Sequence, residues 1–309
     1  MKKIPTSLKD GLVGLAIGTA IIIPGISGGT IALIFGAFKK ITTAVGNLFK
    51  SFWKSLLLLL PFGIGAVLAI AGLYVPFQYA FEYCMFAIIT LFAGFILGSI
   101  PSVVDGVKGE KPTVINVVLL IVGLAVATCI GVFSVLWDFN QSVTDLFTNH
   151  EWYLFLIIFV VGIISSTGLI VPGLSGSLIL LVIGFYQPIF NLPSLIIQNK
   201  NLWVNLGLLF VFAIGVLIGF IIFSKIMSYL LDKHKKSTYY TIIGFIVGSL
   251  VSIYVNSNMF AYLGNGHDHL LDWILAPIFF IIGLAISIVM HIYIIKHPSK
   301  EEKEIVENA

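Results

Sequence analysis

The sequence contains the stretch Ile22-Ile23-Pro24-Gly25-Ile26-Ser27-Gly28-Gly29-Thr30, which returns 148 positions later as Ile170-Val171-Pro172-Gly173-Leu174-Ser175-Gly176-Ser177-Leu178. A second block, Gly94-Phe95-Ile96-Leu97-Gly98-Ser99, returns as Gly244-Phe245-Ile246-Val247-Gly248-Ser249. Two separate blocks that recur in the same order predict a duplicated chain. Each copy is centred on a Pro-Gly-x-Ser-Gly break.

The composition is typical of a protein that lies in a membrane. Of its 309 residues, 59% are hydrophobic and 10% are charged, whereas soluble domains carry about 25% charged residues. The mean hydropathy is +1.08, and apolar segments of about 20 residues are long enough to cross the hydrocarbon as helices. We therefore expect an all-α polytopic membrane protein.

The apolar segments fall into two sets of four, and the first segment of each set contains the break. The segments are about 11–38, 55–75, 83–101 and 114–136 in the first copy, and about 152–190, 203–224, 239–256 and 273–295 in the second. The arms of the first break, 11–23 and 30–38, reach about 20 Å and about 14 Å. Neither arm spans a hydrocarbon layer of about 30 Å, so the segment either enters halfway and returns or crosses once as a broken helix.

Lysine placement favours the returning hairpin, because cytoplasmic loops are enriched in lysine. All 17 basic residues are lysines. If each broken segment returns to its own side, only Lys200 lies outside, and the cytoplasmic set is Lys2, Lys3, Lys9, Lys39, Lys40, Lys50, Lys54, Lys108, Lys111, Lys225, Lys233, Lys235, Lys236, Lys296, Lys300 and Lys303. The outer loops then carry Glu82, Asp138, Asp145, Glu151, Asp268 and Asp272.

These assignments predict two inverted repeats, each a re-entrant or broken helical hairpin plus three transmembrane helices. A returning hairpin and three crossings make an odd number, so the second copy enters the membrane upside down. Because arm 152–171 is long enough to span, the second hairpin is either re-entrant or fully spanning. The organisation is 1–9 cytoplasmic N-terminus, 10–137 first repeat, 138–151 extracytoplasmic linker, 152–295 second, inverted repeat, and 296–309 cytoplasmic tail.

The breaks have the chemistry of an anion site. Proline ends the first arm, glycine permits the reversal, and serine caps the second arm. The N–H groups behind the cap carry the positive end of a helix dipole, and two breaks that meet at the midplane would hold one small anion. The candidate binding residues are Pro24, Gly25, Ser27, Gly28, Gly29, Thr30, Pro172, Gly173, Ser175, Gly176 and Ser177. The alternative is a tight turn in which each serine only caps its own helix.

Ionisable residues are absent from the apolar segments, apart from His291 near a cytoplasmic end. Asp10 and Glu82 stand at segment edges, where solvated positions are expected. This pattern argues against a carboxylate-coupled pump or a cation channel. The G-x-S-G pattern of both breaks also resembles the nucleophile motif of intramembrane serine proteases, but such chemistry needs a base beside the serine. We therefore expect no enzyme, no cofactor, no metal and no nucleic-acid partner, and a homo-oligomer is compatible with the sequence.

Small residues spaced four apart predict close helix packing. The pairs are Gly14/Gly18, Gly94/Gly98, Gly215/Gly219 and Gly244/Gly248. Aromatic residues at segment ends are typical of interfacial anchors, and they are Trp137, Trp152, Tyr153, Trp203 and Trp273.

Both breaks, the Gly184-Phe185-Tyr186 that follows the second, and Phe92-Ala93-Gly94-Phe95-Ile96-Leu97-Gly98-Ser99-Ile100-Pro101 resemble the DUF368 family over residues 8 to 295. The resemblance implies a bacterial polyprenyl-phosphate transporter, a flippase of the cytoplasmic membrane with both termini cytoplasmic. It would return undecaprenyl phosphate from the outer to the inner leaflet for envelope synthesis, with the lipid phosphate as the anion. Phe38-Lys39-Lys40 departs from the aromatic-acidic pair expected there. A carrier of another small organic anion is the alternative, followed by an intramembrane serine protease.

Overall fold

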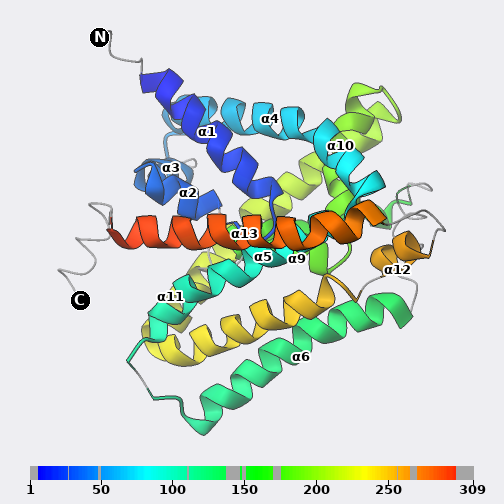
Figure 1. Ribbon diagram of the computed structural model, residues 1–309. Coiled ribbons are helices and arrows are strands. Elements are labelled where there is room, and N and C mark those ends of the chain that lie inside the picture. The colour runs from blue at the N-terminus through cyan, green and yellow to red at the C-terminus, as the bar shows by residue number, and fades with distance from the viewer. Residues whose placement is uncertain are drawn as a thin grey trace.

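The computed structural model describes residues 6–26, 28–47, 50–109, 111–136, 147, 151–169, 175–255, 257–264 and 270–296, and the regular elements in these ranges are helical. Figure 1 shows their arrangement. The helices of the first half are α1 (Thr6–Ile22), α2 (Gly28–Ile34), α3 (Phe38–Gly46), α4 (Phe52–Tyr83), α5 (Met85–Val104), η1 (Asp105–Val107) and α6 (Val114–Leu136). Those of the second half are α8 (Tyr153–Ser165), η2 (Ser166–Leu169), α9 (Gly176–Val182), α10 (Tyr186–Ile197), α11 (Leu202–Ser252), α12 (Ser257–Leu263) and α13 (Leu270–Lys296).

Within the described residues, five helices are long and apolar enough to cross a membrane. They are Phe52–Tyr83, Met85–Val107, Val114–Phe133, Leu202–Ser252 and Leu270–Tyr293. The pair α9 and α10 is apolar enough to be a further span but is bent by 109°. The prediction of an all-α polytopic membrane protein is therefore confirmed.

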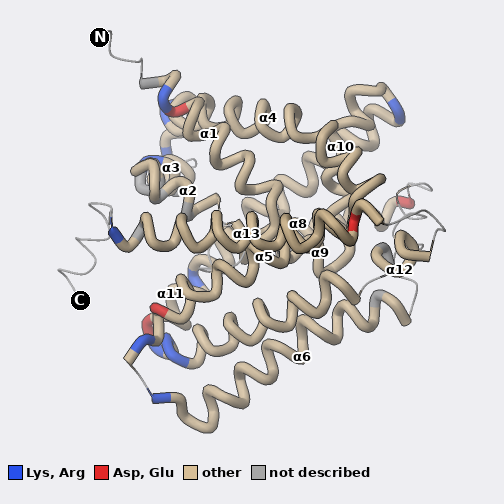
Figure 2. Tube along the Cα trace, in the orientation of Figure 1, with Lys and Arg blue, Asp and Glu red and all other residues tan. Residues whose placement is uncertain are grey.

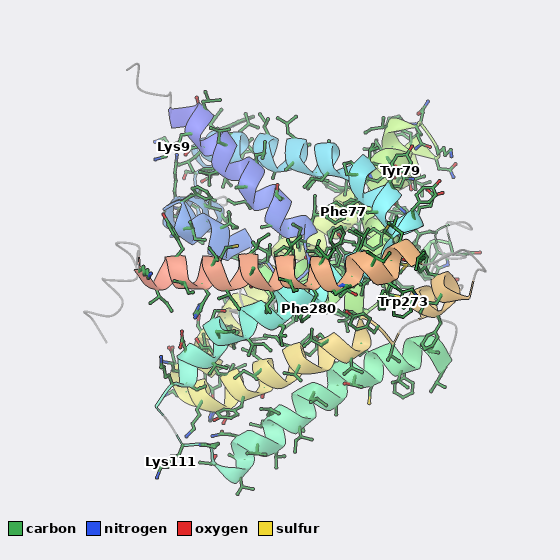
Figure 3. All side chains as sticks on the ribbon, viewed as in Figure 1. Lys9, Phe77, Tyr79, Lys111, Trp273 and Phe280 are labelled. Atoms are coloured by element: carbon green, nitrogen blue, oxygen red, sulfur yellow. The ribbon has the colours of Figure 1, made fainter. Side chains whose placement is uncertain are left out.

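Lysine positions gather at one end of the helix bundle, as Figure 2 shows. This lysine-rich end holds the start of α1, α3, the start of α4, the connection between α5 and α6, the middle of α11 and the end of α13. In Figure 3, Lys9 and Lys111 lie at this end, whereas Tyr79 and Trp273 lie at the opposite end. The connection between α10 and α11, which contains Lys200, also lies at the opposite end. The opposite orientation of the two copies in a membrane stays a prediction. The lysine-rich end is the end that this prediction places in the cytoplasm.

Corresponding helices of the two copies make corresponding contacts. In the first copy α1 packs on α4, and in the second α8 packs on the first half of α11. Across the copies, α5 packs on α13 and α6 packs on α11. The two copies are therefore interlocked, because α5 and α6 both lie against helices of the other half.

The predicted glycine pairs stand at these helix contacts. A Cβ added at Gly14 would lie 2.2 Å from the carbonyl oxygen of Phe62, and one at Gly244 would lie 2.0 Å from that of Leu120. Such distances are shorter than a carbon atom tolerates, so the absent side chain is what allows the backbones to meet. The remaining predicted glycines make equivalent close approaches, namely Gly18, Gly94, Gly98, Gly215, Gly219 and Gly248. Their structural role is confirmed.

The lysine-rich stretch between the predicted segments 203–224 and 239–256 is helical rather than a loop. α11 (Leu202–Ser252) consists of two helices that join at His234, whose backbone angles are not helical, with φ −137° and ψ 35°. The chain reverses at this kink, as Figure 1 shows. Positions 225–238 contain no Asn, Gly or Pro, the residues that would mark a loop. The residues present there tolerate helical backbone angles, so the helix continues on both sides of the kink at His234.

Two acidic residues placed by the sequence at solvated edges have partners in the structure. Asp272 is not in an outer loop but in the first turn of α13, where it is 1% exposed and accepts hydrogen bonds from the Ala87 N–H and the Tyr262 hydroxyl. Burial, and then the bond to this carboxylate, raises the pKa of Tyr262. Asp10 forms an ion pair with Lys40 of α3.

The core is formed by side chains of α5, α8, α9, α10 and α11. Its largest fully buried side chains include Phe92, Ile96, Ile158 and Leu178. Because these residues belong to both copies, the core fixes the two breaks relative to each other.

We expect Gly65→Ala to lower the thermal stability of the protein in detergent, because a Cβ there would lie 2.0 Å from the carbonyl oxygen of Gly11 in α1. Overpacking of this kind costs about 1–3 kcal/mol. Gly63→Ala, on the same helix with no atom within 4 Å of its Cβ, is the control and should be neutral or stabilising. Equal melting temperatures for the two variants would contradict the α1–α4 contact.

We expect a cysteine at Lys200 to react with a membrane-impermeant maleimide in intact cells, and a cysteine at Lys111 to react only after permeabilisation. The background is a variant in which Cys84 and Cys129 are replaced by serine. Labelling is read by a mass shift. Reaction of both cysteines in intact cells would contradict the lysine-based topology.

Candidate functional site

The first break separates α1 from α2 by five residues. Gly25 has φ +92°, a region that favours glycine, and a Cβ there would lie 2.7 Å from the backbone nitrogen of Ile96 in α5. The Ile26 N–H bonds to the carbonyl of Ile23 at 3.2 Å, which closes the turn. α2 then folds back on α1, since a Cβ at Gly28 would lie 3.2 Å from the Ile21 side chain. Ser27 and the side chain of Thr30 lie outside the described part of the chain.

The second break has the same form where it is described. α8 continues as η2 to Leu169, and α9 begins at Gly176. Ser175 caps α9, because its hydroxyl accepts the Leu178 N–H at 3.2 Å. α9 lies against η2, and a Cβ on Gly168 would be 2.2 Å from the nitrogen of Gly176. Pro172 and Gly173 fall outside the described residues.

The two breaks meet, as the sequence predicts. The Gly25 N–H donates to the Ser175 hydroxyl oxygen at 2.9 Å, and both groups are buried. The Tyr186 hydroxyl donates to the carbonyl of Ile22 at 2.7 Å, which satisfies one of the carbonyl groups that the end of α1 leaves without a helical partner. Side chains of the second copy therefore satisfy an N–H group and a carbonyl group of the first break.

A cavity of about 300 Å³ lies beside this contact. The polar part of its lining, the polar wall, is formed by Ser165, Ser166, Gly168, Ser175, Gly176 and Ser177. The larger part of the lining is apolar, and the side chains of this apolar wall include Ile70 of α4, Ile189 and Phe190 of α10, and Leu209, Phe212 and Val216 of α11. The cavity thus offers a polar surface and an apolar surface to one occupant.

The predicted site residues divide into two groups. Gly28, Ser175, Gly176 and Ser177 line the cavity. Pro24 and Gly25 are buried in the turn, and Gly29 is half-buried in α2, and none of the three is among the residues that line the cavity.

Sequence reasoning missed Ser165, Ser166 and the apolar wall, and it quoted Tyr186 only as part of the family resemblance. A signal was available in the comparison of the two copies. The positions 148 residues earlier than Ser165 and Ser166 are Ile17 and Gly18, and the counterpart of Tyr186 is Phe38. The second copy therefore carries hydroxyl groups that the first copy lacks, which makes the cavity asymmetric.

The donors of the polar wall are neutral. No Asp, Glu, Lys or His is among the residues that line the cavity. The Ser175 hydroxyl oxygen accepts two N–H groups, which fills both of its acceptor positions. In its 3.3 Å contact with the Ser177 hydroxyl, Ser175 is therefore the donor, and the hydroxyl hydrogen of Ser177 remains available to a ligand. The N–H groups of Gly176 and Ser177 stand in the first turn of α9, where helices leave such groups unpaired. This wall can hold an anion through hydrogen bonds alone.

Catalytic and metal chemistry find no support around the cavity. The Nε2 atom of His291 lies 3.2 Å from Asp105 at the lysine-rich end, outside the cavity lining. No group of three His, Cys, Asp or Glu residues in the described ranges could hold a metal ion.

Comparisons with known proteins agree with one another. Residues 17–270 match the model of the VCA0040-like, undecaprenyl phosphate translocase-like family. A polyprenyl-phosphate transporter of Staphylococcus aureus is 32% identical over 282 residues, which cover 90% of this chain and 94% of the relative. A polyprenyl-phosphate transporter of Vibrio cholerae is 29% identical over 262 residues, which cover 80% of this chain and 77% of the relative. No solved structure matches the chain significantly.

The family match extends over both breaks and over the second repeated block. The described helices are those of a multi-pass membrane protein, as a translocase of membrane lipids requires. The chain therefore belongs to the undecaprenyl phosphate translocase-like family.

Proposed function

We propose that this protein carries a polyprenyl phosphate, such as undecaprenyl phosphate, from the outer to the inner leaflet of the bacterial cytoplasmic membrane, where the lipid carrier is used again in envelope synthesis. The cavity beside the two breaks supports this function, because its lining combines a polar wall of hydroxyl and N–H groups with a larger apolar wall. The printed names of both relatives support the same substrate class.

The phosphate headgroup binds at the polar wall. Transfer of an unpaired ion into hydrocarbon costs roughly tens of kcal/mol by Born estimates. The protein must therefore replace the water molecules that hydrate the phosphate. The Ser177 hydroxyl, to which Ser175 donates, and the N–H groups of Gly176 and Ser177 supply the replacement, and Gly28 lets the ligand approach the first break closely. Ser27, Gly29 and Thr30 complete this set on the first break, and Pro172 and Gly173 shape the second.

The isoprenoid tail lies against the apolar wall and leaves the protein between α4 and α10. This seam is narrow, and its polar link is the Tyr74 hydroxyl, which donates to the Ser194 hydroxyl at 2.6 Å. The rest of the seam is aromatic, with the rings of Tyr74 and Phe190 5.4 Å apart. Such a seam can open toward lipid without exposing a buried charge.

Charge balance constrains the transport step. Movement of one negative charge inward against an inside-negative potential costs about 2.3 kcal/mol per 100 mV. No carboxylate lines the cavity, so the phosphate itself, with a second pKa of about 6, is the group that can carry a proton. The alternative driving force is a concentration gradient of the lipid between the leaflets. A transport rate that depends on neither pH nor membrane potential would favour this alternative.

A transporter without catalytic activity is the role that we propose. A serine protease would need a base in hydrogen-bond reach of the nucleophile. The partners of the Ser175 hydroxyl are Gly25, Leu178 and Ser177, and none of them is a base.

The variant Ser175→Ala with Ser177→Ala should transport undecaprenyl phosphate about tenfold more slowly or worse, because hydrogen bonds to a charged group contribute about 1.5–3 kcal/mol each. The measurement is inward movement of labelled lipid in proteoliposomes with equal amounts of protein. The matched control is Ser249→Ala, a buried serine outside the cavity whose hydroxyl donates to the carbonyl of Phe245. Transport at the normal rate in the double variant would reduce the second break to a structural turn.

Val216→Trp should abolish transport, because the indole fills the apolar side of the cavity. Leu217→Trp is the control on the next residue of α11, which is 47% exposed and lies outside the cavity. Both are compared in the same proteoliposome assay. Equal loss in the two variants would show that the cavity is not the path of the lipid.

Competition by a water-soluble organic anion, with no competition from lipid phosphates, would instead favour a carrier of that anion.

A further inference from the structure

A second polar hollow, the α3–α4 groove, lies at the lysine-rich end between α3 and the first turns of α4. Its volume is about 540 Å³. Two facing stripes of side chains at helical spacing form its walls, with Lys40, Thr43 and Asn47 from α3 and its C-cap, and Ser51, Lys54 and Ser55 from the start of α4. Residues three, four or seven positions apart share a helix face, so each wall presents one ammonium group together with neutral polar groups.

The hydroxyl groups of this groove are not used by the fold. Ser51 stands at the N-cap of α4, yet its side chain makes no capping hydrogen bond. Ser55 is only 4% exposed and lines the groove. Among the described residues, its hydroxyl makes no hydrogen bond and is not one of the fully enclosed unpaired groups, so it is open to the groove. An unpaired serine that faces a groove is an observation that a ligand would explain.

The charge of the groove is positive. The Lys40 ammonium pairs with Asp10 and stands 5.3 Å from the centre of the Phe62 ring, so its position is fixed. Lys54 is exposed and has no ion-pair partner within the described residues. The N-terminus of α4 adds partial positive charge, and the first turn of this helix contains no acidic residue that would offset it.

We propose that the α3–α4 groove binds the phosphate monoester headgroup of the transported lipid, as a second station at the lysine-rich end. A phosphate monoester carries a charge of about −1.5 to −2 and three acceptor oxygens, which suit two ammonium groups and the hydroxyls of Ser51 and Ser55. The lipid tail lies outside the groove, against Phe52, Trp53 and Leu57, which are 55%, 72% and 66% exposed.

The position of the groove relates it to the central cavity, and this inference therefore rests on the proposed function. α2 begins at Gly28, which lines the cavity, and is followed by Gly36, which lines the groove. A helix of seven residues is about 10 Å long. A headgroup that leaves the cavity toward the lysine-rich end meets the groove after a short step along α2.

The fluorescence of Trp53 tests the groove directly, because this residue neighbours Lys54. In a full-length variant with Trp137, Trp152, Trp203 and Trp273 replaced by phenylalanine, farnesyl phosphate should change the Trp53 emission in a saturable manner. Lys54→Gln should weaken the apparent affinity about fivefold, which corresponds to one lysine beside an anionic group. Ser55→Ala should weaken it as well. The control is Lys233→Gln, an exposed lysine at the same end but outside the groove.

The outcomes separate the site from its alternatives. No saturable response, or one that Lys54→Gln leaves unchanged, overturns the proposal. Equal weakening by Lys54→Gln and Lys233→Gln also overturns it, because surface potential alone would then explain the binding. Inorganic phosphate should bind at least tenfold more weakly than farnesyl phosphate, and equal affinity overturns the assignment to a lipid.

The proposed function is tested apart from the groove. The variant Ser175→Ala with Ser177→Ala should lose transport but keep the Trp53 response, because its groove is intact. If that variant transports normally while the Trp53 response persists, the headgroup site at the second break fails and the groove stands. If the unmodified protein moves no undecaprenyl phosphate in proteoliposomes, the proposed function fails, whereas the Trp53 response still decides whether the groove binds the lipid.

Discussion

The hydrogen bond from the Gly25 N–H to the Ser175 hydroxyl joins two interrupted helices at the centre of the bundle. A backbone that breaks within a membrane exposes N–H and C=O groups, and each unsatisfied group costs several kcal/mol, roughly. The protein satisfies them across the two copies, since Tyr186 likewise donates to the carbonyl of Ile22. The first break thus depends on side chains of the second copy, and the cavity lies where the two breaks meet.

Close helix packing between the two copies places the two breaks next to each other. α5 of the first copy packs on α13, and α6 packs on α11, through glycines such as Gly94 and Gly244 whose Cβ would collide with a neighbouring carbonyl oxygen. In lipid there is little hydrophobic force between helices, so association depends on such close backbone contact. Gly25 makes a close backbone contact of the same kind at the first break, because it lies directly against the backbone of Ile96.

The distribution of charge separates the interior from the ends. The Lys, Asp and Glu positions of the described residues lie near the ends of the bundle (Figure 2), and the cavity is lined by hydroxyl, N–H and apolar groups. Neutral donors hold an anion less tightly than ammonium groups do, which suits a site that must release its ligand on either side. The lysine-bearing α3–α4 groove differs in this respect and is suited to capture at the membrane surface.

Composition, repeats and charge pattern by themselves determined the membrane class, the duplication and the breaks, because hydrophobicity and helix-breaking residues act locally. They also located the helix-packing glycines and the cap at Ser175. The tertiary structure alone decided that Gly25 bonds to Ser175, 150 positions away, that Ser165, Ser166 and Tyr186 join the cavity, and that Asp272 is buried. These features arise from packing between distant helices, and no local pattern encodes which side chains such packing brings together.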